Sequence, residues 1–153
     1  MSAAIIFTDL DGTLMDHHTY SLAAALPTVQ AMSDRGIPVI PCTSKTRAET
    51  AKIMASLGLS GPMIVENGAA IWVPADSGLV RPEGAESTDG GWCHRFGPSR
   101  GMIRRQLAIL NVEWGNRYQS LCELSDKQVA AVTGLDLEAA ELEQPEPLQI
   151  GLL

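Results

Sequence analysis

Cysteine, basic residues and long apolar runs are all scarce in this chain of 153 residues. Its three cysteines, Cys42, Cys93 and Cys122, are odd in number and form no C-x-x-C pair, which argues against a disulfide framework and a zinc site. The 11 basic residues stand against 18 acidic ones, and the net charge of -7 argues against general attraction to nucleic acid or an anionic membrane. No apolar run approaches the roughly 20 residues of a membrane span, and no basic segment precedes a long apolar one at the N-terminus. We therefore expect a cytoplasmic protein without nucleic-acid or membrane partners, in which local groups hold any anionic ligand.

The hydrophobic pattern predicts an α/β fold with a Rossmann-like parallel sheet. Hydrophobic residues make up 45% of the chain and charged residues 19%, which is typical of a globular domain. Short apolar runs alternate with segments that have helix start and stop signals, such as Pro27 and Gly36, or Thr46 with Glu49 three residues later. The predicted order is strand 3–8, helix to Gly36, strand 37–42, helix from Thr46 to near Gly58, strand 63–66 and a hairpin through Asn67-Gly68 into strand 69–73.

The pattern changes after Val73, where residues 74–91 are rich in proline, glycine and acidic residues. We place a domain boundary here, with residues 1–74 as the core and residues 75–153 as the start of a second, α+β unit. In that second unit we expect a strand over 92–96, a helix over 99–110, a helix from Ser125 to near Gly134 and a last turn over 137–142.

Two carboxylates follow the first predicted strand, in the stretch "FTDLDGTL". Residues two apart in a strand point the same way, so Asp9 and Asp11 can project together from its carboxyl end while Leu10 turns back to the core. That end of a parallel sheet is where ligands bind, and two neighbouring carboxylates favour a Mg²⁺ ion between them. One carboxylate can then attack a phosphorus atom while the other transfers a proton. The alternative is a plain turn, since Asp and Gly are common turn residues.

Two further polar segments follow the second and third predicted strands. In "PCTSKT", Thr43 and Ser44 offer hydroxyl and N–H groups before a helix, and Lys45 adds a positive charge, although an ordinary helix cap would look the same. In "ENGAAI", Asn67 and Gly68 suit either a substrate-facing loop or a hairpin turn alone. The adjacent histidines at 17 and 18 are expected to be solvated rather than metal ligands.

These motifs carry a resemblance. "FTDLDGTL" resembles the first motif of the haloacid dehalogenase superfamily of Mg²⁺-dependent phosphatases, and Thr43 stands where the second motif places its phosphate-binding hydroxyl. More narrowly, the chain is similar to the mannosyl-3-phosphoglycerate phosphatase family, Cof-like enzymes with an inserted cap that release phosphate and mannosylglycerate. The segments that carry this similarity are "FTDLDGTLMDHHTY", "PCTSKTRAE", "ENGAAI", "RFGPSRGMIRRQL" and "LSDKQVAAVTGLDLEAAEL".

The resemblance implies a role for each candidate residue. Asp9 would be the nucleophile, Asp11 the general acid and base, and Thr43 the phosphate ligand. Mg²⁺ would bind to Asp9 and to the backbone carbonyl of Asp11. The substrate, a phosphorylated sugar, would contact four further residues: Ser44, Lys45, Asn67 and Gly68.

One part of the family pattern is not found in these 153 residues. Family members continue past the cap to a third-motif lysine and a fourth-motif acidic pair, so the resemblance predicts a C-terminally truncated form. Such a form would have an incomplete core sheet, with an open edge where the chain could self-associate. Two alternatives stay open: a non-catalytic fragment that binds Mg²⁺ or a sugar phosphate, and a related phosphatase such as one that acts on sucrose phosphate.

Overall fold

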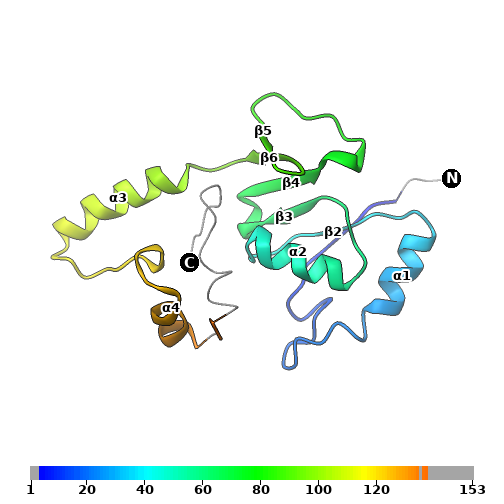
Figure 1. Ribbon diagram of the computed structural model, residues 1–153, viewed down its shortest axis with the longest axis horizontal. Helices are drawn as coiled ribbons and strands as arrows, with labels where there is room; N and C mark the ends of the chain where they lie inside the picture. Colours follow the sequence, from blue (N-terminus) through cyan, green and yellow to red (C-terminus); the bar gives the residue numbers. More distant parts are fainter. Residues whose placement is uncertain (1–3, 135, 138–153) are drawn as a thin grey trace. The chain divides into compact units, whose positions relative to one another are not determined.

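The computed structural model describes residues 4–134 and 136–137. The chain divides into two compact units, Met1–Phe96 and Gly97–Leu153, and each is described by itself (Figure 1). Within the described residues, no helix combines the length and the apolar character that crossing a bilayer would require.

The first unit begins with the predicted alternation of strands and helices. Its order is β1 (Ile6–Thr8), α1 (Leu26–Asp34), β2 (Val39–Pro41), α2 (Arg47–Ser56) and β3 (Met63–Val65). Strands β1 and β2 pair in parallel, and a parallel bridge between Cys42 and Ile64 continues the pairing toward β3. The predicted α/β fold with parallel strands is therefore confirmed, although each strand is shorter than the apolar run that indicated it.

Local signals explain where the two helices begin. Pro27 occupies the first turn of α1, where a missing N–H group costs nothing. The capping box expected at α2 is present, because Thr46 Oγ1 accepts the N–H of Glu49 and the Glu49 carboxylate accepts the N–H of Thr46. Both helix starts were therefore predicted correctly from the sequence.

An antiparallel sheet in the order β3-β4-β6-β5 completes the first unit. It adds β4 (Ala70–Pro74), β5 (Glu86–Thr88) and β6 (Gly91–Arg95). The predicted hairpin joins β3 to β4, but Val65 pairs with Ala70, so its connection has four residues instead of a two-residue turn. The strand expected over 92–96 exists as β6, yet it pairs with β4 in the first unit and does not open a second one.

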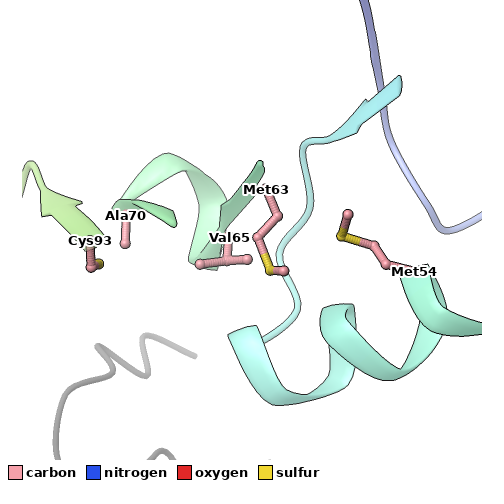
Figure 2. Close-up of a cluster of buried hydrophobic side chains, with 5 residues drawn as sticks. All are labelled: Met54, Met63, Val65, Ala70 and Cys93. Atoms are coloured by element: carbon pink, nitrogen blue, oxygen red, sulfur yellow. The ribbon is translucent and has the colours of Figure 1, made fainter. Parts of the chain in front are cut away.

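The core of this unit lies between α2 and the antiparallel sheet. Met54 of α2 points toward Met63 and Val65 of β3, and Ala70 and Cys93 from the next strands extend the cluster (Figure 2). Residues 63 and 65 share a face because side chains alternate along a strand. This packing fixes α2 against β3, so the loop before α2 and the loop after β3 are held by one core.

The second unit contains two α-helices and a short 3-10 helix (Leu121–Glu123) among its described residues. α3 (Arg100–Glu113) begins at Ser99, whose hydroxyl accepts the Met102 N–H at 3.3 Å, and α4 (Asp126–Thr133) begins with a capping box formed by Ser125 and Gln128. Both helices agree with the sequence prediction, and α3 is longer than expected. The last turn predicted over 137–142 lies almost entirely outside the described residues, and the boundary proposed at residue 74 stays a prediction.

Candidate active site

The first candidate segment, residues 9–13, is a tight turn that leaves β1. Leu10 is fully buried, as predicted, and its carbonyl accepts the N–H groups of Thr13 at 3.2 Å and Met15 at 2.8 Å. Gly12 has φ +70°, a left-handed conformation that glycine adopts without strain. The buried leucine and the two hydrogen bonds fix the backbone, while the Asp9 side chain is exposed and that of Asp11 is half-buried.

The second candidate segment, residues 43–46, connects β2 to α2. Thr43 is buried, donates its N–H to the Ile64 carbonyl at 3.0 Å, and accepts the Lys45 N–H on Oγ1 at 3.2 Å. Ser44 is exposed. Because Thr46 caps the helix, the other residues of this segment stand just before a helix N-terminus, where unpaired N–H groups favour an anion.

The third candidate segment is the hairpin connection after β3. Glu66, Asn67 and Gly68 have φ values of 53°, 57° and 85°, which places three consecutive residues in the left-handed region. Two hydrogen bonds secure this turn: the Glu66 N–H donates to the Lys45 carbonyl, and the Asn67 N–H donates to the Thr43 carbonyl, both at 3.0 Å. The second and third segments are thus joined through their backbones, and Asn67 and Gly68 remain exposed.

An ion pair joins the first segment to the second. Lys45 Nζ lies 3.2 Å from Asp11 Oδ1, and the two side chains are 20% and 36% exposed. Asp9 is close enough to Cys42 for its negative charge to contribute to the raised pKa of the Cys42 thiol, whose largest cause is burial. A raised pKa favours the protonated thiol, which is the less reactive form.

The metal-binding capacity of these segments is limited to oxygen atoms. Asp9 and Asp11 supply two carboxylates, and the described residues contain no group of three or more His, Cys, Asp and Glu side chains able to hold a metal. Mg²⁺ is commonly bound through one or two carboxylates, with water and substrate phosphate as the other ligands, so this donor set fits Mg²⁺. His17 and His18 lie in an exposed loop and contact each other edge to face.

Two features of the site were not anticipated from the sequence. One is the contact between Lys45 and Asp11, which depends on tertiary placement and has no local signal. The other is the left-handed conformation of Glu66 and Asn67. Its signal was the Asn-Gly pair, which we interpreted as a two-residue turn.

Comparison with protein families and curated proteins matches this unit. Residues 6–81 fit the family model described as haloacid dehalogenase-like hydrolase, a range that contains all three candidate segments. A glucosyl-3-phosphoglycerate/mannosyl-3-phosphoglycerate phosphatase of Methanococcoides burtonii is 39% identical over 138 residues, which are 90% of this chain and 51% of that protein. A protein of the same name from Persephonella marina is 49% identical over 70 residues, 46% of this chain and 26% of that protein.

Solved structures agree on the fold. A phosphatase of the haloalkanoate superfamily from Bacteroides thetaiotaomicron aligns with a TM-score of 0.56 at 17% identity, covering 89% of this chain and 50% of that one. A haloacid dehalogenase-like hydrolase from B. subtilis aligns with a TM-score of 0.50 at 23% identity, covering 92% and 52%. The chain thus spans about half the length of the M. burtonii relative and of these structures. The family model, the relatives and the fold agree, and residues 6–81 match the haloacid dehalogenase-like hydrolase family.

Proposed function

We propose that this chain is a phosphoric monoester hydrolase that acts on a glycosyl-3-phosphoglycerate. The observation that carries the proposal is the Lys45–Asp11 ion pair, which brings the segment after β1 against the segment before α2. A carboxylate pair, a cation and a helix N-terminus at one edge of a parallel sheet suit phosphoryl transfer, which depends on positioning and charge stabilisation.

Each candidate residue has a role in the proposed reaction. Asp11 first takes up a proton from water. A carboxylate oxygen of Asp9 then attacks phosphorus, and the bond from phosphorus to the glycerate oxygen breaks as Asp11 gives that oxygen this proton. This step leaves an aspartyl phosphate on Asp9. Asp11 then takes a proton from water, whose oxygen attacks phosphorus and releases phosphate from Asp9. The Thr43 hydroxyl and the N–H group of Ser44 bind the phosphate oxygens, since the N–H groups of Thr43, Lys45 and Thr46 already donate to protein acceptors.

Mg²⁺ belongs to this proposal as the ion that offsets the negative charge of phosphate and carboxylate. The residues that would hold it are Asp9, through its carboxylate, and Asp11, through its backbone carbonyl. The remaining ligands would be water and a phosphate oxygen, as is usual for this ion.

The proposed substrate is mannosyl-3-phosphoglycerate, with mannosylglycerate and phosphate as products. The names of both relatives include a glucosyl and a mannosyl substrate, which differ only in the sugar. We infer that the 3-phosphoglycerate portion is what the loops before α2 and after β3 recognise. Ser44, Asn67 and Gly68 are the residues of these loops with exposed surface for such contacts.

The test is release of phosphate from mannosyl-3-phosphoglycerate by the purified 153-residue chain in the presence of Mg²⁺. Asp9→Asn is expected to abolish release, while Asp76→Asn, an exposed carboxylate outside the three segments, is expected to leave it unchanged. Phosphate release that persists in Asp9→Asn would refute the assignment of Asp9 as the nucleophile. Sucrose phosphate and glucosyl-3-phosphoglycerate serve as competing substrates to define specificity.

A second candidate function is binding of Mg²⁺ or a sugar phosphate without turnover. The observation that favours it is the small donor set, since the segment after β1 offers two carboxylates and the described residues contain no group of three or more His, Cys, Asp and Glu side chains able to hold a metal. A folded chain that binds mannosyl-3-phosphoglycerate yet releases no phosphate would support this function. The proposed division into a core of residues 1–74 and a partial cap of residues 75–153 is checked by comparing the folding of residues 1–74 with that of residues 1–96. Self-association through the outer edge of β1 is checked by sedimentation.

A further inference from the structure

Lys45 is held in a way that leaves only its charged end able to move. Its N–H donates to Thr43 Oγ1 at 3.2 Å, and its carbonyl accepts the Glu66 N–H at 3.0 Å, so the backbone is bonded on both sides. The side chain reaches Asp11, and its 20% exposure leaves the ammonium open to a ligand that enters from solvent. A flexible four-carbon side chain on a fixed backbone can change partner without a change of fold.

Lys45 is also the only basic residue in the sequence of the three candidate segments, 9–13, 43–46 and 66–68. The neighbouring Arg47 has another position, because its guanidinium lies 4.7 Å from the centre of the Trp72 ring and donates to the Asp89 carbonyl at 3.4 Å. An anion held by these three segments therefore meets one ammonium group that they themselves supply, and that group already has an anionic partner.

We propose that Lys45 exchanges partners during the reaction, pairing with Asp11 in the resting protein and with the phosphate group when substrate is bound. The inference rests on the proposed function and assigns Lys45 a role in phosphate binding that is coupled to Asp11. A phosphate dianion attracts the ammonium more strongly than a single carboxylate does, and both anions share the same edge. The exchange delivers positive charge to the phosphate and leaves the Asp11 side chain able to turn toward the leaving oxygen.

A fixed ion pair is the opposing model, and a double-mutant cycle separates the two. If Lys45 must leave Asp11 to bind phosphate, then Asp11→Asn strengthens phosphate binding in two ways. It removes the repulsion between the Asp11 carboxylate and the phosphate, and it also releases the Lys45 ammonium from its ion pair. The loss of repulsion alone is measured in the Lys45→Met background, where no ammonium is present. A fixed pair predicts the same effect of Asp11→Asn in both backgrounds, or a weaker affinity when Lys45 is present.

The probe is inorganic phosphate, titrated into the ¹⁵N-labelled chain in EDTA so that no metal contributes, with the backbone amides of residues 43–46 as the readout. Lys45→Met is expected to weaken phosphate binding roughly tenfold, which is the loss expected for one partly exposed charged contact. Lys52→Met, which removes an ammonium from the exposed side of α2, is the matched control and is expected to change affinity less than about twofold. Lys45→Arg keeps the charge and is expected to retain most of the affinity.

The decisive quantity is the effect of Asp11→Asn in the two backgrounds. We expect the gain in phosphate affinity to be about two- to fivefold larger in the parent background, which keeps Lys45, than in the Lys45→Met background. Equal gains, or no binding of phosphate by the parent chain, would overturn the exchange. The test is independent of catalysis: a positive cycle without phosphate release would contradict only the proposed function, and release with a null cycle would contradict only the exchange.

Discussion

Asn67 offers a direct test of the backbone conformation that supports the candidate site. Its φ and ψ angles are 57° and 32°, the left-handed helical region, and its N–H donates to the Thr43 carbonyl at 3.0 Å. Asn tolerates this region, glycine adopts it without strain, and alanine is penalised by contact of its Cβ with the backbone. Asn67→Gly and Asn67→Ala remove the same polar side chain but differ in the energetic cost of holding the backbone in the left-handed conformation.

The size of the difference follows from the geometry. A left-handed conformation costs an ordinary residue such as alanine about 1–2 kcal/mol. Glycine avoids that cost, but it lowers folding stability by about 0.5–1 kcal/mol because it gives the unfolded chain more conformational entropy. Asn67→Ala is therefore expected to be less stable than Asn67→Gly by about 1 kcal/mol. The assay is urea unfolding followed by the fluorescence of Trp72 and Trp92, which belong to the first unit, with Trp114 of the second unit replaced by Phe.

The same two variants separate conformation from recognition. If the Asn67 side chain contacts the substrate, both variants raise KM for mannosyl-3-phosphoglycerate by a similar factor. If only the turn matters, Asn67→Gly keeps the parent KM while Asn67→Ala does not. Equal unfolding free energies for the two variants would refute the reasoning, because the left-handed turn would then be absent in solution.

Three other perturbations test the packing of the first unit and the pKa of Cys42. Met54→Ala opens a cavity in the core of Figure 2 and is expected to lower the free energy of unfolding by about 2–5 kcal/mol in urea titrations. Gly91→Ala would place a methyl group against the Val73 carbonyl oxygen and should cost about 1–3 kcal/mol, while Gly101→Ala, in α3 with open space around it, should not lower stability in the same assay. Burial raises the pKa of Cys42 above its usual value of 9.0, so the protonated thiol contributes to the free energy of unfolding. This contribution is fully present below pH 9.0 and is lost as the pH rises through the higher pKa of the folded state. Alkylation at mildly alkaline pH, read by peptide mass spectrometry, should be slower at Cys42 than in a free peptide and faster after Asp9→Asn, because the Asp9 charge contributes to the raised pKa.

The elements that could be predicted from the sequence are those with a local physical cause. Helix α2 has its capping box at Thr46, α1 has Pro27 in its first turn, and α4 has Ser125 with Gln128, and all three were anticipated. A short apolar run before a polar turn likewise identified β1, β2 and β3. In each case, the signal and the structure it specifies lie within a few residues of each other.

The features that could not be predicted depend on contacts between distant residues. β6 was expected to open a second unit, because the glycine- and proline-rich residues before it look like a boundary, yet its ladder with β4 keeps it in the first unit. The four-residue hairpin connection depends on two carbonyls of the preceding loop, at Thr43 and Lys45, which accept the Asn67 and Glu66 N–H groups respectively. The sequence of residues 66–68 does not indicate which distant carbonyl groups will accept these hydrogen bonds.

The plain interpretations of the three motifs and the functional ones are compatible, because the charged side chains are not part of the scaffold and the Thr43 hydroxyl, whose oxygen accepts the Lys45 N–H, still has a hydrogen to donate. The segment 9–13 is a turn, residues 43–46 end in a helix cap and residues 66–68 do form a hairpin, so every structural alternative is realised. These roles are filled by backbone groups, by Gly12 and by the Thr46 side chain. The carboxylate of Asp9 and the ion pair between Asp11 and Lys45 take no part in that scaffold. A turn, a cap and a hairpin thus supply the fixed positions on which charged side chains can act, and an active site at this edge requires them.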